Sequence, residues 1–122
     1  MLKLLLDEVI SPDVASSLRR GRAIIVSTMA EWEGGNFLGK DKSAILLEAA
    51  AQGLTLVTYD RRTIPPLLKA WAEEERSHGG VIFVDEKSIS QAEIGGLVSS
   101  LTRLTNEARK WDWTNRVSLL RR

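Results

Sequence analysis

Three aspartates stand where a parallel sheet would bring them to one crevice. Asp7 follows an apolar run at residues 2–6, and Asp60 follows a second run at residues 54–58. Asp41 lies between them, at the start of a helical pattern. If the two runs form neighbouring parallel strands, the carboxylates that follow them meet at the edge where open α/β sheets bind their ligands.

Carboxylates brought so close together repel one another, and a divalent cation relieves that repulsion. Clustered carboxylates suit Mg²⁺ or Mn²⁺. The chain has no cysteine and one histidine, His78, so a bound metal would be held mainly by oxygen. The three aspartates are therefore candidate metal ligands, and the chain is a candidate metal-dependent enzyme.

Length and composition point to one domain. A chain of 122 residues can bury a core without disulfides. Its formal net charge of +1 gives no general electrostatic reason to bind nucleic acid. The apolar run at residues 2–6 is too short to span a bilayer and lacks the features of a signal peptide. We expect a single cytoplasmic domain, residues 1–122.

Strand and helix patterns alternate along the chain, which predicts an α/β protein with a mostly parallel sheet. Strands are expected at residues 2–6, 23–26, 54–58 and 81–84, with a short fifth strand near 116–120. Right-handed crossovers place helices on both faces of such a sheet. We therefore predict a three-layer α/β/α sandwich of four to five strands, in the order 2-1-3-4 with the fifth strand at an edge.

Residues with known roles at helix ends mark the expected helix boundaries. Ser11 and Asp41 are candidate N-caps, and Gly21 and Gly53 are candidate stop signals. The helices that they predict cover residues 12–20 and 41–52, and a third helix is expected at 64–77. Ser90 and Glu93 match a capping box that opens the last helix, with Ile89 and Ile94 at the staple positions.

The segment from residue 28 to residue 40 is expected to form a loop near the acidic crevice. It contains three glycines, Gly34, Gly35 and Gly39, and a short helix is expected around residues 29–33. This loop would lie over the crevice that holds the aspartates.

With these residues placed, the chain resembles the PIN-domain superfamily, and especially the compact bacterial PIN-like domains related to VapC toxins. The resemblance covers roughly the first two-thirds of the chain, and its middle segment from Asp41 to Asp60 is moderately specific. It rests on Leu6-Asp7-Glu8, on Asp41 before Ile45, Leu46 and Ala49, and on Gly53 followed by Val57-Thr58-Tyr59-Asp60.

PIN domains are typically Mg²⁺- or Mn²⁺-dependent ribonucleases. The resemblance therefore implies an RNA substrate, and it implies metal-binding and catalytic roles for Asp7, Asp41 and Asp60. It also implies an antitoxin protein and a second copy of the chain as candidate partners. The chain departs from the family pattern in two places. The family's helical glutamate between the first two aspartates has no secure match here, although Glu31 and Glu33 lie nearby. The segment Arg61-Arg62-Thr63 stands where many relatives carry an aspartate and a phenylalanine.

Other charged residues are expected near the same edge. Candidates for an additional acid are Glu8, Glu31, Glu33 and Asp85, and candidates for phosphate binding are Lys40, Lys42, Arg61 and Arg62. Three arginines near the end of the sequence could also contact RNA: Arg116, Arg121 and Arg122.

Each feature of the proposed site also has a structural explanation. Asp41 could serve only as a helix cap and Asp60 only as a turn residue. Lys40 and Lys42 could neutralise the carboxylates in a metal-free protein. Two alternatives to the ribonuclease therefore stay open: a PIN-like binding module without catalysis, and a receiver-like phosphoacceptor domain built on Asp7, Glu8 and Asp60.

Overall fold

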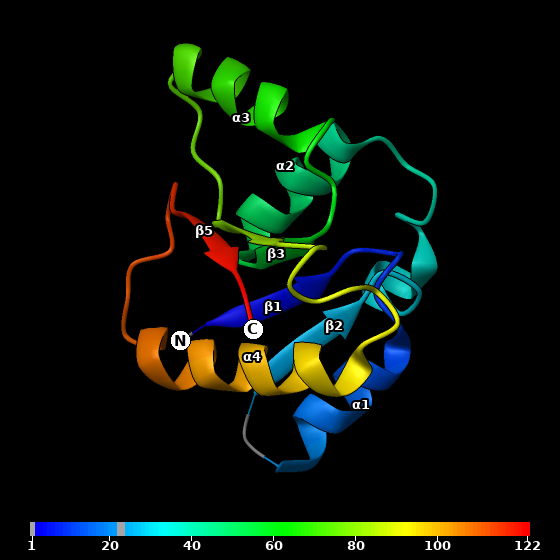
Figure 1. Ribbon diagram of the computed structural model, residues 1–122. Coiled ribbons are helices and arrows are strands. Elements are labelled where there is room, and N and C mark those ends of the chain that lie inside the picture. Colours follow the sequence, from blue (N-terminus) through cyan, green and yellow to red (C-terminus); the bar gives the residue numbers. More distant parts are fainter. Residues whose placement is uncertain (1, 22–23) are drawn as a thin grey trace.

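The computed structural model describes residues 2–21 and 24–122. In this part of the chain, strands and helices alternate from one end to the other (Figure 1). The elements are β1 (Lys3–Leu6), α1 (Pro12–Gly21), β2 (Ile25–Thr28), the 3₁₀ helix η1 (Trp32–Gly35), α2 (Lys42–Gln52), β3 (Thr55–Thr58), α3 (Ile64–Glu73), β4 (Val81–Val84), α4 (Ile94–Ala108) and β5 (Val117–Leu120).

The described strands form a single parallel sheet in the order β2-β1-β3-β4-β5. This confirms the predicted order, with the fifth strand at an edge. Leu6 at the end of β1 lies opposite Thr28 in β2 and Val57 in β3. The chain moves outward from β1 to β2, then crosses back to β3 and continues to β4 and β5. The strand order therefore reverses between β1 and β3, which is where α/β sheets place their ligands.

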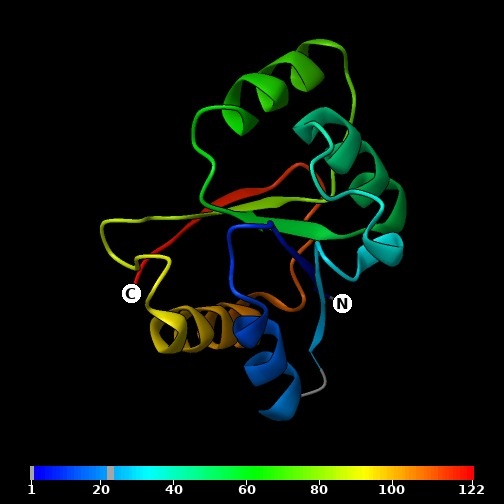
Figure 2. The same cartoon turned by 90° about the vertical axis from the view of Figure 1, so that its right-hand side faces the viewer.

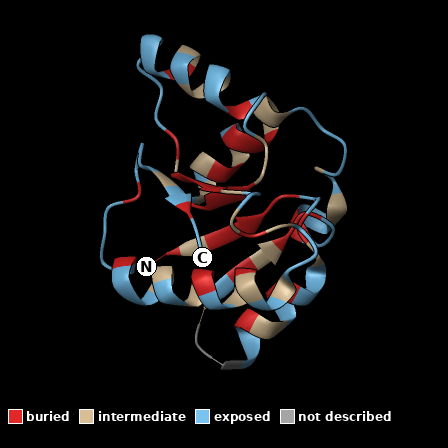
Figure 3. Ribbon diagram, in the orientation of Figure 1, coloured by how far each residue is buried: buried red, intermediate tan, exposed pale blue. Residues whose placement is uncertain are grey.

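Helices cover both faces of the sheet, as predicted. Figure 2 shows α2 and α3 on one face and α1 and α4 on the other. Alternate side chains of β1 enter the two cores, because Leu4 and Leu6 pack with α1 and α4 while Leu5 packs with α2 and α3. The central strands are consequently buried (Figure 3). No helix in the described residues is long and apolar enough to cross a bilayer.

Local signals placed two helices as expected. The Ser11 hydroxyl accepts a hydrogen bond from the Asp13 N–H (3.2 Å), and α1 begins at the intervening proline. Asp41 caps α2 by accepting from the Ala44 N–H (2.9 Å). Gly53 ends α2 in the left-handed region with φ = 68°, a conformation that glycine adopts at little cost.

Three predicted boundaries were wrong. Strand β2 spans Ile25–Thr28 and so ends two residues later than predicted, because its pairing with β1 continues as far as Thr28. The predicted start of that strand, Ala23, lies outside the described residues. Helix α3 ends at Glu73 instead of residue 77. Glu75 takes a left-handed φ of 57°, and the Arg76 N–H donates to Trp71 O (2.8 Å), so a Schellman-type stop forms without a glycine.

The third error concerns the start of α4, which begins at Ile94 after Glu93 as its N-cap. Only half of the predicted capping box is present, since the Ser90 N–H donates to Glu93 Oε1 (2.9 Å). The Glu93 N–H donates to the Ser90 backbone oxygen (3.0 Å), which makes residues 90–93 a turn before the helix. One face of α4 packs into the core, because Leu97 and Leu101 are fully buried.

His78 lies beyond the end of α3, in the buried connection to β4. Its Nδ1 accepts a hydrogen bond from the Gly80 N–H (3.0 Å), which requires that nitrogen to be unprotonated. Burial lowers the pKa of the imidazole below its ordinary value of 6.5. The folded protein therefore favours the neutral histidine.

We expect the free energy of unfolding to fall as the pH drops below about 6.5, because the unfolded chain binds a proton there that the folded chain resists. Urea titrations at pH 7.5 and at pH 5.5 measure this loss. In His78→Asn the amide oxygen can replace Nδ1 as acceptor, so this variant should lose less stability across the same interval. Equal losses in the two proteins would contradict the assignment.

Substitution of Leu5 by alanine should destabilise the protein by about 2–5 kcal/mol, since its side chain is fully buried in the central strand. Leu47→Ala is the matched control, because Leu47 is 55% exposed on α2 and its loss should change stability by about 0.5 kcal/mol or less. Urea denaturation of both variants checks the difference. Similar values for the two would contradict the packing described above.

Candidate functional site

Asp7 is a buried charge at the carboxyl end of the central strand. Its backbone continues the sheet, because the Asp7 N–H donates to Val57 O (3.0 Å). Only 2% of the residue is exposed. A carboxylate buried to this degree needs both a charge partner and hydrogen bonds.

Both needs of Asp7 are met by residues from other elements. Lys42 Nζ lies 2.8 Å from each carboxylate oxygen. The Thr58 hydroxyl donates to Oδ2 (2.7 Å), and the Glu8 N–H donates to Oδ1 (2.9 Å). The first turn of α2 and the end of β3 are thus both tied to the end of β1.

Thr58 also connects Asp7 to Asp60. The Asp60 N–H donates to the same hydroxyl oxygen (2.9 Å), so one side chain bridges the two aspartates. Oδ1 of Asp60 in turn accepts from the N–H groups of Arg62 (3.0 Å) and Thr63 (2.8 Å). The residues that follow β3 are thereby held in a tight turn at the site.

The pKa of Asp60 is lowered in this setting. Partial burial acts to raise it, but the hydrogen bonds from the N–H groups of Thr63 and Arg62 and the positive charge of Lys42 together outweigh that effect. Lys42 therefore acts electrostatically on Asp60 while it contacts Asp7 directly. Asp60 stays ionised near neutral pH.

Asp41 reaches the site as the residue before Lys42. It is exposed, and its Oδ1 is used in capping α2. The structure thus joins Asp7 and Asp60 through Thr58 and Lys42 and places Asp41 beside that lysine in the chain. Its roles as a metal ligand and a catalytic residue stay predictions, as do those of Asp7 and Asp60.

The additional acids predicted from the sequence have separate surroundings. Glu8 Oε1 accepts from the Gly39 N–H (3.3 Å), which brings the glycine-containing loop to the end of β1 as expected. Glu31 pairs with Arg19 and accepts from the Thr28 N–H (3.0 Å), and these hydrogen bonds lower its pKa. Glu33 is exposed. Asp85 accepts from the Lys87 N–H (3.2 Å) and lies 3.5 Å from Arg121 Nε.

The predicted phosphate-binding residues divide into two groups. Lys42 is engaged by Asp7, whereas Lys40, Arg61 and Arg62 are exposed. A hollow of about 530 Å³ lies at Asp60, between the ends of β3 and β4. It is lined by Asp60, Arg61, Arg62, Asp85, Glu86 and Lys87, with Tyr59 and Val84 beneath.

Tyr59 is one of the residues that line this hollow. Its hydroxyl donates to Ile89 O (3.0 Å). Burial, with a contribution from the nearby Glu86 and Glu93 carboxylates, raises the pKa of the phenol to about 12. Tyr59 is therefore neutral and acts as a hydrogen-bond donor rather than as a base.

The oxygen ligands at this site suit a hard divalent cation, but the positive charge beside Asp7 is that of Lys42. Oxygen ligands of Asp7, Asp41 and Asp60 are the type that Mg²⁺ and Mn²⁺ prefer. Across residues 2–21 and 24–122, no three acidic or histidine side chains are grouped in a metal-binding arrangement. Cation binding at these residues would therefore require Lys42 to move away from Asp7.

Thr58 is the site residue that sequence reasoning missed, and the sequence indicated Lys42 only as a phosphate contact or a general counter-charge. Thr58 left a signal, since it is a hydroxyl at the end of an apolar strand and two residues before Asp60. Lys42 left a weaker signal, because a lysine in the first turn of a helix is unfavourable to the helix dipole. Its charge is balanced by Asp7 instead.

Comparisons with protein-family models, with curated protein sequences and with solved structures found no match for the chain.

Lys42→Met should lower the free energy of unfolding by about 3 kcal/mol or more, because it leaves the Asp7 carboxylate buried without a charge partner. The double variant Asp7→Asn/Lys42→Met should recover most of this loss, since the buried charge is also removed. Urea denaturation of the single and double variants gives the coupling between the two side chains. Lys40→Met, at an exposed lysine nearby, is the control and should change stability little.

A double variant as unstable as the sum of its single variants would contradict a direct Asp7–Lys42 interaction.

Proposed function

We propose that the chain is a PIN-like, metal-dependent ribonuclease that hydrolyses RNA phosphodiester bonds at the carboxyl edge of β1 and β3. The observation that carries this proposal is the linkage of Asp7 and Asp60 at the reversal of strand order, through the Thr58 hydroxyl and the Lys42 ammonium group. The resemblance of the same residues to PIN domains supplies the reaction class.

In this proposal Asp7, Asp41 and Asp60 would hold Mg²⁺ or Mn²⁺. Such a cation, when bound, activates water and stabilises the leaving oxygen of a phosphodiester. The residues of the chain prepare the site in two ways. The turn after β3 fixes the Asp60 carboxylate through two backbone N–H groups, and the lowered pKa of Asp60 keeps it charged.

Lys42 is the residue whose position would have to change. Its side chain is 19% exposed and stands in the first turn of α2, so its flexible stem can turn toward solvent while the backbone stays in place. Once released from Asp7, the ammonium group would be available to an RNA phosphate beside the same carboxylates.

Exposed basic groups beside the crevice provide the substrate contacts in this proposal. Arg61, Arg62 and Lys40 lie around the acidic residues, and the hollow between β3 and β4 offers room for part of an RNA strand. We further propose, from the resemblance to toxin-related PIN domains, a cytoplasmic toxin that is neutralised by an antitoxin protein and that forms homodimers.

A second function is favoured by a specific contact. The Asp7–Lys42 ion pair satisfies the buried carboxylate without metal. The segment Arg61-Arg62-Thr63 also uses its backbone to cap Asp60 instead of supplying a further acid. Both features suit a PIN-like module that binds RNA or protein and does not cleave.

Cleavage of a fluorescent RNA, together with calorimetric titration of Mn²⁺, separates the two functions. For the ribonuclease we expect Mn²⁺ binding and cleavage, and we expect Asp60→Asn to slow cleavage by about tenfold or more. The asparagine oxygen can still accept the two backbone hydrogen bonds, so the turn should be preserved. Asp112→Asn, which removes an exposed acid between α4 and β5, should retain most of the activity.

Cleavage by Asp60→Asn as fast as by the parent would exclude the proposed site. Absence of Mn²⁺ binding and of cleavage in both the parent and Lys42→Met would support the binding module.

A further inference from the structure

The two edge strands, β2 and β5, differ in whether side chains cover their unpaired backbone groups. Edge strands expose rows of unpaired N–H and C=O groups, which proteins commonly cover. At β2 this cover is present: Arg19 Nη2 donates to Val26 O (2.7 Å), and Glu31 Oε1 accepts from the Thr28 N–H (3.0 Å). Arg19 and Glu31 are also paired with each other, so the β2 edge is closed by side chains.

At β5, no side chain of the described residues covers the outward-facing N–H and C=O groups of the strand. The Val81 N–H donates to Arg116 O (3.0 Å) and the Asp85 N–H donates to Leu120 O (2.9 Å), so these even-numbered positions face β4. Alternation along a strand then turns the peptide groups of Val117 and Leu119 outward. Nearby side-chain hydrogen bonds go elsewhere, since Arg103 donates to Arg121 O (2.9 Å) and the Arg122 N–H donates to Ser88 Oγ (2.7 Å).

The same two residues also expose apolar side chains. Val117 is 52% exposed and Leu119 is 42% exposed, whereas every residue of β3 and β4 is buried. The pale colour of the β5 arrow in Figure 3 marks this contrast. Strand β5 therefore presents both free backbone groups and apolar surface.

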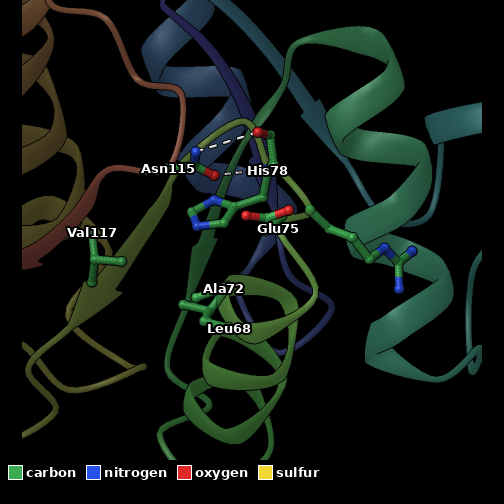
Figure 4. A pocket seen from close by; sticks show the side chains of 8 residues that line it. Leu68, Ala72, Glu75, His78, Asn115 and Val117 are labelled. Atoms are coloured by element: carbon green, nitrogen blue, oxygen red, sulfur yellow. Dashed lines mark hydrogen bonds between the residues drawn. The ribbon is translucent and has the colours of Figure 1, made fainter.

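A hollow lies on the α3 side of β5. Its volume is about 420 Å³, and Leu68, Ala72 and Val117 supply its apolar lining (Figure 4). His78 and Asn115 also line the hollow. The His78 N–H donates to Asn115 Oδ1 (3.0 Å), and Asn115 Nδ2 donates to Ser77 Oγ (3.3 Å). Glu75, Arg76 and Ser77 complete the lining, so the hollow offers an apolar contact with polar groups beside it.

A second hollow lies on the α4 side of the same strand. Its volume is about 430 Å³, and its lining includes Leu104, Leu120, Glu107 and three arginines, Arg103, Arg121 and Arg122. Helices α3 and α4 lie on opposite faces of the sheet, so the two hollows lie on opposite sides of β5 (Figure 2). Arg121 pairs with Asp85 and Arg122 with Glu93, but both pairs are exposed to solvent, so an acidic side chain can compete for these arginines.

We propose that β5 is a docking edge for an extended peptide segment of a partner protein, with acidic and apolar side chains in alternation. Such a segment would add to the sheet as a sixth strand and pair with the peptide groups of Val117 and Leu119. Because successive side chains of a strand point to opposite faces, its apolar side chains would enter the α3-side hollow and its acidic side chains the α4-side hollow.

Charge distinguishes this partner from a second copy of the chain. Arg116 and Arg121 flank β5 at its two ends. Antiparallel pairing of two β5 strands can place these arginines opposite one another, and like charges in that position are destabilising. An acidic segment would be attracted by the same residues. The proposal does not depend on ribonuclease activity, since the edge lies to the side of the acidic crevice.

The test uses the full chain and synthetic peptides of about six residues, because that length spans β5. A peptide that alternates glutamate and valine should bind with a Kd below about 1 mM by calorimetry. Amide NMR shifts should concentrate at residues 117–119. A peptide that alternates lysine and valine is the control and should bind at least tenfold more weakly.

Leu119→Pro provides the matched variant. Proline removes an N–H that faces away from β4, a position where edge strands tolerate it, so the sheet should remain while peptide binding is lost. Arg121→Glu is a second variant that leaves the backbone intact, since this side chain is 68% exposed. It should weaken binding of the glutamate–valine peptide about tenfold.

Three results would overturn the proposal. The first is no binding of the glutamate–valine peptide, or equal binding of the lysine–valine peptide. The second is self-association of the parent chain in sedimentation runs that Leu119→Pro abolishes, which would identify a second copy as the occupant. The third is single-stranded RNA that displaces the peptide from residues 117–119, which would identify this edge as a nucleic-acid surface.

Discussion

The burial of one carboxylate, that of Asp7, constrains the whole carboxyl edge of the sheet. Asp7 is 2% exposed at the end of the central strand, where water cannot solvate its charge. Its oxygens are satisfied by Lys42 from α2 and by Thr58 from β3. The position of α2 against the sheet and the conformation at the end of β3 are therefore linked to one charged group.

Thr58 extends this constraint to the turn that follows β3. Its hydroxyl donates to Asp7 and accepts from the Asp60 N–H, so neither aspartate can shift without affecting the other. Each aspartate also has a structural role, because Asp7 balances a lysine, Asp41 caps a helix and Asp60 forms a turn. An acidic site used in catalysis and a metal-free binding module would need the same scaffold, which is why both proposals rest on the same contacts.

The candidate acidic site and the candidate docking edge lie on different parts of the sheet. The acidic residues lie where the strands end, at the reversal of strand order, whereas the docking edge runs along the side of β5. The opposite side is closed by Arg19 and Glu31. Glu31, a candidate fourth acid from the sequence, thus has a clear structural role at an edge strand.

Much of the fold was predictable because its signals are local. Continuous apolar runs indicated strands buried on both faces, and the caps at Ser11, Asp41 and Gly53 marked helix ends through their own backbone preferences. Boundaries failed where no such signal existed. The stop of α3 uses Glu75 in a left-handed conformation, which a sequence without glycine at that position does not indicate.

The order of the strands, the two helical layers and the arrival of Asp7 and Asp60 at one edge of the sheet all follow from the sequence alone. They result from periodicity, from the handedness of crossovers and from the position of each aspartate after its strand. The group that balances Asp7 depends instead on tertiary packing, because Lys42 stands 35 residues away and reaches the carboxylate only when α2 packs on the sheet. The uncovered β5 edge also depends on tertiary packing, because the side chains that could cover an edge strand come from residues distant in the sequence.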